Sequence, residues 1–231
     1  MDRFHTGSVD AVILDVQCFK DNTNDLLLKE VSVVEVNSGT ILLHHIAKPP
    51  FDRDSLTEEK LRESYWLTKH CHGLEWDRGD IPYYVLMDKL RTCLTRRTLV
   101  YVKGSEKKEF VQRNFIIDPV TTTVVDMSDL GCGSLTSTSN LLSTNVVRCG
   151  QHKRRGTHKR CALANCTVLR GWLFLTANNN DHDIKDNNDV DDIASGSGSS
   201  FTSCFCTCPC HLTTTISTET INSAFGIDTV Q

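Results

Sequence analysis

Cys149-Gly-Gln-His152 and, after eight further residues, Cys161-Ala-Leu-Ala-Asn165-Cys166 form the most informative stretch of this sequence. Two thiolates and an imidazole this close together can bind one zinc ion, because these are donors that tetrahedral Zn²⁺ prefers. A fourth ligand must come from elsewhere in the chain. The stretch therefore constrains the whole fold, since tertiary structure has to bring a distant residue to the site.

Length and composition predict one folded domain followed by a tail. The chain has 231 residues, 39% of them hydrophobic, which suffices for a core of domain size. The apolar run Ala11–Leu14 is too short for a signal peptide, and no stretch approaches the roughly 20 apolar residues that span a bilayer. We therefore expect an intracellular protein of the cytoplasm or nucleus, with no membrane association and with its cysteines as thiols or metal ligands.

Two blocks of opposite charge lie near the C-terminal end and are hidden by the net charge of -4. An acidic block occupies positions 181–192. The basic block lies among the proposed zinc ligands and consists of Arg148, Lys153, Arg154, Arg155, Lys159 and Arg160. This basic cluster indicates binding of a polyanion, and solvated loop charge is the alternative.

Hydrophobic periodicity predicts a mixed α/β fold. Three strands come first, at Ala11–Val16, Glu30–Val36 and Thr40–Ile46, and a helix follows to about His70 with a capping box of Ser55 and Glu58. We then expect, in order, a helix over Tyr83–Leu94, a strand over Thr98–Lys103, a helix from Ser105, a fifth short strand from Phe115–Asp118 and Thr122–Val125, and a last helix over Cys161–Leu173.

This order of elements is that of an RNase H-like fold, a mixed β-sheet flanked by helices. We expect the domain to cover residues 9–177. The stretch 178–231 is acidic and rich in Ser, Thr and Cys, and it predicts a disordered tail. Its cysteine-rich run, Cys204–Cys210, lacks the structural context that would give it a specific role.

The chain resembles RNase H-like exonucleases of the DEDD type in layout but lacks their carboxylates. The first strand carries Asp15-Val-Gln17, where the amide cannot supply the charge that a hard divalent cation needs. Arg160 and Asn165 stand at the last helix where such nucleases carry a histidine and an aspartate. Two-metal phosphodiester hydrolysis at this site is therefore not expected.

With the motif and the element order together, the chain is similar to the Maelstrom domain, an RNase H-like domain of piRNA silencing. That family carries a Glu-His-His-Cys-His-Cys set, and the residues that match it in order are Glu30, His44, His72, Cys149, His152 and Cys161. The resemblance implies a zinc ion held by Glu30, Cys149, His152 and Cys161. It also implies binding of single-stranded RNA and of silencing-pathway proteins. Some members of the family cleave RNA without the usual nuclease site.

The residues themselves leave alternatives open. Four protein ligands would make the zinc structural, whereas the alternative is ordinary thiols beside a basic face. His44 and His72 are candidates for acid and base, but an isolated histidine is more often a hydrogen-bonded structural residue. Unpaired bases could stack on Trp66, Trp76 or Tyr101.

These observations lead to three hypotheses about the function of the protein. The first is binding of single-stranded RNA by a degenerate nuclease domain in RNA-mediated gene silencing. The second is metal-independent RNA cleavage by an endonuclease that uses His44 and His72. The third is a protein-interaction scaffold stabilised by zinc.

Overall fold

The computed structural model describes residues 10–116, 118–142, 146, 149–152 and 161–183, all within one compact unit, Met1–Asp191. The strands are β1 (Ala11–Lys20), β2 (Leu26–Glu35), β3 (Ile41–Lys48), β4 (Ile81–Pro82), β5 (Leu99–Val102) and β6 (Thr123–Asp126). The α-helices are α1 (Glu58–Trp66), α2 (Tyr83–Leu94), α3 (Ser105–Phe115), α4 (Leu135–Leu141) and α5 (Ala162–Asp183). A 3₁₀ turn, η1 (Arg53–Ser55), precedes α1, and a π-helical turn, η2 (Leu67–Cys71), extends it.

The six strands form one sheet in the order β4-β3-β2-β1-β5-β6. β1 and β2 are antiparallel, as are β2 and β3, whereas β5 and β6 continue the sheet parallel to β1. An antiparallel meander followed by parallel strands with helical crossovers is the RNase H-like arrangement. The predicted fold class is therefore confirmed by the strand order.

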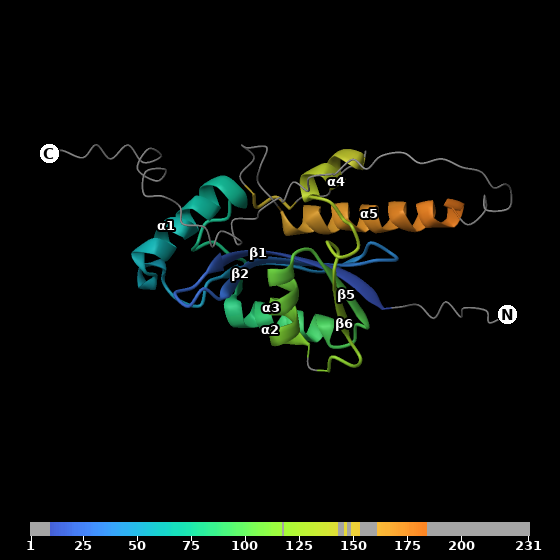
Figure 1. The fold of residues 1–231 in the computed structure, drawn as a ribbon. Helices are drawn as coiled ribbons and strands as arrows, with labels where there is room; N and C mark the ends of the chain where they lie inside the picture. Colours follow the sequence, from blue (N-terminus) through green and yellow to red (C-terminus); the bar gives the residue numbers. More distant parts are fainter. Residues whose placement is uncertain (1–9, 117, 143–145, 147–148, 153–160, 184–231) are drawn as a thin grey trace. The chain divides into compact units, whose positions relative to one another are not determined.

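Helices cover both faces of this sheet (Figure 1). α2 and α3 lie on one face, where Leu86, Leu90 and Leu94 recur at helical spacing and are buried against the central strands. α5 crosses the other face and packs on β1 and β2. Because β1 and β2 are covered on both sides, they carry nearly continuous apolar runs, as a doubly covered strand does.

A β-bulge in β2 places the site residues on the α5 face. Gln17 of β1 lies opposite Glu30, but the next residue, Cys18, lies opposite Leu28, so Lys29 is the extra residue in this ladder. A bulge of one residue changes which side chains face each side of a sheet. Glu30 thereby contacts the first residue of α5.

Gly171 in α5 lies against the side chain of Leu142, which would have to move if a larger residue stood here. A Cβ at this position would come within 2.9 Å of Leu142, the residue that caps the C-terminal end of α4. The glycine that weakens the helix in isolation therefore serves the packing of α4 on α5.

Several boundaries differ from the sequence-based expectation. Thr57 caps α1 and accepts a hydrogen bond from the Lys60 amide, so the capping box of Ser55 and Glu58 is wrong. The fifth strand is Thr123–Asp126 alone, because Phe115 still belongs to α3. The short elements β4 and α4 were not expected, since neither is long enough to show a periodicity.

The last helix begins as expected but continues to Asp183. The division into a domain of residues 9–177 and a disordered tail of residues 178–231 remains a prediction, and Cys204–Cys210 lies outside the described residues. Within the part of the chain that the structure describes, no helix combines the length and apolar character needed to cross a bilayer.

Candidate metal centre

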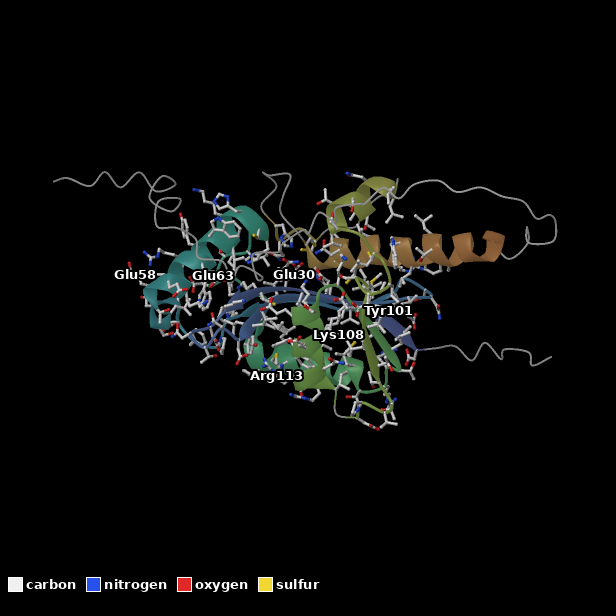
Figure 2. All side chains as sticks on the ribbon, in the orientation of Figure 1. Glu30, Glu58, Glu63, Tyr101, Lys108 and Arg113 are labelled. Atoms are coloured by element: carbon white, nitrogen blue, oxygen red, sulfur yellow. The ribbon has the colours of Figure 1, made fainter. Side chains whose placement is uncertain are left out.

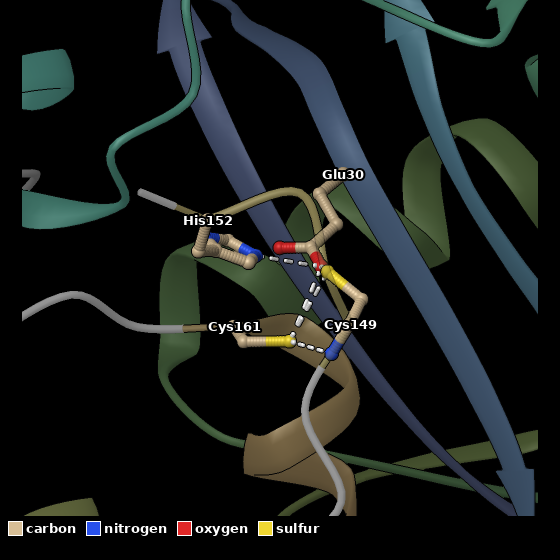
Figure 3. A group of neighbouring side chains, drawn as sticks. All are labelled: Glu30, Cys149, His152 and Cys161. Atoms are coloured by element: carbon tan, nitrogen blue, oxygen red, sulfur yellow. Dashed lines mark hydrogen bonds and ion pairs between the residues drawn. The ribbon is translucent and has the colours of Figure 1, made fainter. Parts of the chain in front are cut away.

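Four side chains from three distant parts of the chain converge on one point (Figure 3). Glu30 comes from β2, Cys149 and His152 from the segment before α5, and Cys161 from the residue that precedes α5. One ligand atom from each lies within 4.8 Å of the others. These are the four residues proposed as zinc ligands from the sequence, and the group could hold a metal ion such as zinc.

Glu30 is the centre of the cluster and is fully buried. Its Oε1 lies 3.1 Å from His152 Nε2 and 3.5 Å from the sulfur of each cysteine. Its Oε2 accepts a hydrogen bond of 3.0 Å from the amide of Ala162, at the N-terminus of α5. In Figure 2 this glutamate lies beneath α5, whereas Glu58 and Arg113 lie at the surface.

Burial raises the pKa of Glu30, although the hydrogen bond with His152 acts in the opposite direction. A buried carboxylate without a cation is costly, because it has lost its hydration. The site therefore favours a positive charge beside Glu30, supplied either by protonated His152 or by a metal ion.

The ring of His152 is oriented by a backbone carbonyl. Its Nδ1 lies 2.5 Å from the carbonyl oxygen of His72, and since a carbonyl can only accept, Nδ1 carries the proton. Nε2 is then directed at Glu30. A second hydrogen bond that fixes the tautomer of a histidine is typical of metal ligands.

Hydrogen bonds within the cluster shift the pKa values of its members. Burial lowers the pKa of His152, but hydrogen bonds with Cys161 and Glu30 outweigh it and raise the value to about 10. The hydrogen bond from Cys149 lowers the pKa of Cys161 to about 3, and the same contact raises the pKa of Cys149. One thiolate is therefore already favoured, and thiolate is the form that binds metal.

Four of the six distances between the ligand atoms match those of a tetrahedral ion. With Zn–S bonds of about 2.3 Å and Zn–N or Zn–O bonds of about 2.0 Å, tetrahedral angles place two sulfurs about 3.8 Å apart, sulfur and oxygen about 3.5 Å apart, and nitrogen and oxygen about 3.3 Å apart. The corresponding distances are 3.7 Å between the sulfurs, 3.5 Å from each sulfur to Oε1, and 3.1 Å from Nε2 to Oε1.

The two other histidines of the predicted set lie around this cluster but differ in exposure. His44 Nε2 is 3.9 Å from Glu30 Oε1, and its side chain is partly exposed. His72 is 1% exposed, accepts a hydrogen bond from the Leu74 amide through Nδ1, and packs edge-on against Phe19. The carbonyl oxygen of His72 contacts the cluster through Nδ1 of His152.

Asp15, the remaining carboxylate of the nuclease layout, is buried and satisfied by protein groups. The ammonium of Lys107 donates to Oδ1, while the amides of Asn165 and Gln17 donate to Oδ2 at 2.7 and 3.3 Å. Lys107 lies on α3 and Asn165 on α5. A cationic nitrogen and two amides therefore surround the carboxylate that would otherwise attract a magnesium ion.

A comparison with protein-family descriptions and one with curated protein sequences find no match. Solved structures of exonuclease domains are similar in fold. The Mopeia virus exonuclease domain, partially complexed with manganese, is 14% identical over 72% of this chain and 78% of its own, with a TM-score of 0.44.

Two further similarities are to fungal nucleases. The pseudoubiquitin hydrolase–RNA exonuclease module of Saccharomyces cerevisiae Pan2, solved with AAUUAA RNA, is 13% identical over 73% of this chain and 29% of its own, with a TM-score of 0.45. The Neurospora crassa Pan2 catalytic unit is 15% identical over 80% and 30% of the two chains, with a TM-score of 0.46. The strand order β4-β3-β2-β1-β5-β6 defines the fold of this chain.

The proposed RNA contacts are only partly placed. Arg148, Lys153, Arg154, Arg155, Lys159 and Arg160 lie outside the described residues. Trp76 is buried between Phe19 and Phe51, so its proposal as a stacking platform is wrong. Tyr101 packs partly on the α5 core, whereas Trp66 is 41% exposed beside His70.

Two lysines that organise the site were missed from the sequence. Lys29 is fully buried and donates to the carbonyls of Ala47, Trp76 and Arg78. Lys107 neutralises Asp15. The signal for Lys29 was its place in the run Leu26-Leu-Leu-Lys-Glu-Val, because a charge inside a buried strand requires partners.

Proposed function

We propose that this chain is a zinc-stabilised RNase H-like domain that binds single-stranded RNA in small-RNA silencing, as the resemblance to the Maelstrom family implies. The observation that carries the proposal is the convergence of Glu30 with Cys149, His152 and Cys161, in a fold whose nuclease carboxylate is neutralised. The domain would thus keep a nuclease scaffold and use it for binding.

Zinc in this site is structural. Four protein donors complete a tetrahedral shell, so no position remains for an activated water. The ion would join β2, the segment 149–152 and the start of α5, which are separated by more than a hundred residues at their extremes. Structural zinc sites contribute roughly 10–16 kcal/mol in small zinc-binding peptides, so the ion is a major source of stability.

Magnesium-dependent exonuclease chemistry is not proposed. Such chemistry requires several carboxylates around two divalent ions. Here Asp15 pairs with Lys107, position 17 is an amide, and Asn165 donates to Asp15 where an acidic residue would bind metal. The site lacks the negative charge that binds magnesium ions, so exonuclease activity should be absent with any nucleic-acid substrate.

The RNA contact surface is the basic cluster, and five of its six residues lie in sequence between the metal ligands His152 and Cys161. If one ion holds both ends of this segment, the segment is already partly ordered before RNA binds. The basic side chains then lose less conformational entropy when they contact phosphates. Each neutralised phosphate of a single strand should contribute a slope of about -0.7 to the dependence of log K on log salt.

The test is fluorescence anisotropy with a labelled oligouridine across a series of salt concentrations. Replacing Lys153, Arg154 and Arg155 by alanine should weaken binding and reduce the steepness of the salt dependence by about 2. The matched control replaces Lys89, Arg91 and Arg96, three exposed cations of the α2 region on the opposite side of the sheet, and should leave both unchanged. An affinity that does not vary with salt contradicts the proposal.

Metal-independent cleavage by His44 and His72 is disfavoured by burial, because His72 cannot reach an RNA without opening the core formed by Phe19 and Trp76. Cleavage of RNA in excess chelator, lost in His44→Ala while the fold is retained, would establish it instead. Purified protein that ignores RNA and binds a silencing-pathway protein would favour the scaffold.

A further inference from the structure

A cavity of about 350 Å³ lies beside the metal centre, between the segment 73–80 and the end of β3. Gln151, the residue before the metal ligand His152, forms part of its wall. On the other side the wall is made by Gly73 and Leu74, which follow His72, whose carbonyl orients His152. The cavity and the metal centre therefore share two segments of backbone.

The walls of the cavity are held in place by buried hydrogen bonds. The ammonium of Lys29 ties the carbonyls of Trp76 and Arg78 to that of Ala47. Asp80 accepts a hydrogen bond of 2.6 Å from the Ile46 amide. A pocket with such a frame needs little ordering when a ligand enters, which favours affinity.

Gly79 shows how tightly this segment packs on β3. A Cβ at position 79 would lie 2.4 Å from the backbone of Ala47 and Lys48, closer than any side chain permits. The segment 73–80 can therefore approach β3 only with glycine here. Gly79 and Lys48 both line the cavity.

Three exposed polar side chains line the cavity and make no side-chain hydrogen bond or salt bridge among the described residues, namely Asp77, Lys48 and Gln151, although the charge of Asp77 also attracts the Lys29 ammonium. They offer a carboxylate acceptor, an ammonium and an amide. Ile46 and Leu74 also line the cavity and are 5% and 4% exposed. A ligand that satisfies all of these has adjacent N–H donors, an acceptor, a flat apolar face and an anionic group.

We propose that this cavity binds a guanine nucleotide, with Asp77 accepting from N1–H and N2–H of the base, Gln151 donating to O6, and Lys48 facing the phosphate. Guanine is the common base with two adjacent donors on its Watson–Crick edge, which match the two oxygens of one carboxylate. The inference rests on the proposed RNA-binding function and adds a base that the protein would recognise within a strand.

The experiment uses the full zinc-loaded chain and calorimetric titration with guanosine, adenosine and cytidine 5′-monophosphates. Guanosine monophosphate should bind about tenfold or more tightly than the other two, the discrimination expected of one bidentate carboxylate contact. Asp77→Asn should remove this preference, because an amide opposes one base donor with its own. Asp88→Asn, an exposed change on α2, is the control and should preserve it.

A second arm separates a free nucleotide from a base in RNA. Oligouridine with one central guanosine should bind more tightly than oligouridine alone, and Gln151→Ala should reduce the difference while zinc content stays constant. Equal affinity for the three monophosphates, or a preference that survives Asp77→Asn, overturns the pocket. If the pocket proposal fails but plain oligouridine binds strongly, the proposed RNA-binding function is still supported. If guanosine monophosphate is preferred but oligouridine does not bind, the pocket is supported and the proposed function is contradicted.

Discussion

Lys107 on α3 donates a hydrogen bond to the buried carboxylate of Asp15 on β1, 92 residues away in the sequence. The amides of Asn165 and Gln17 donate to the other oxygen of the same carboxylate. The pair of Lys107 and Asp15 explains how the domain retains a carboxylate inside the core without a bound metal there, since a buried charge must be paired.

Lys107→Met should be strongly destabilising, because it leaves Asp15 buried without its charge partner. We expect a loss of about 3–5 kcal/mol in the free energy of unfolding, measured by urea denaturation. Lys108→Met is the control, since Lys108 pairs with exposed Asp129 at 3.4 Å and its loss should cost under about 1 kcal/mol. Equal effects of the two changes would show that the Asp15 pair contributes no more than a surface pair.

Cys161→Ser should abolish zinc binding and destabilise the fold. Wild-type protein should carry one zinc ion per chain by elemental analysis, and the variant none, with a fall in melting temperature of roughly 10 °C or more. Cys93→Ser removes a thiol on α2, away from the cluster, and should retain the ion. Zinc retained in Cys161→Ser at full stoichiometry would place the site elsewhere.

Lys29 predicts an alkaline pH dependence. Burial lowers the pKa of Lys29 from 10.5 to about 8, so between these values the unfolded chain holds a proton that the native protein has released. The free energy of unfolding should therefore rise with pH in this window, relative to Lys29→Met, with a slope of at most about 1.4 kcal/mol per pH unit.

Urea denaturation of both proteins at several pH values between 8 and 10.5 measures the difference. If Lys29→Met does not fold, the titration of the Lys29 side chain followed by NMR gives the same pKa directly. An unshifted titration near 10.5 would contradict the burial of this ammonium.

His44 and His72 should respond differently to truncation. His72→Ala removes a ring packed on Phe19 and an acceptor for the Leu74 amide, and should cost about 2–4 kcal/mol. His44→Ala, at a partly exposed position, should cost about 1 kcal/mol or less. Both variants should keep zinc, because neither ring is a ligand; loss of zinc in His72→Ala alone would show that the ring helps to hold the carbonyl that orients His152.

The sequence by itself predicted the order of the longer helices and strands and three of the four residues of the candidate metal cluster. Apolar runs and helical spacing predicted β1, α2 and α3 because burial on one or both faces leaves a local pattern in the chain. Cys149, His152 and Cys161 were found because thiolate and imidazole at short spacing are a local signal of metal chemistry, whereas Glu30 came only from the family resemblance.

Only the tertiary structure decided how these residues meet. The bulge at Lys29 sets which face of β2 carries Glu30, and this register depends on strand pairing that no local pattern encodes. The carbonyl of His72, the ammonium of Lys107 and the cavity beside Gln151 likewise arise from segments far apart in sequence. Every residue has the same backbone carbonyl, so the sequence does not show which carbonyl will accept a hydrogen bond from a site residue. Only the folded structure shows this.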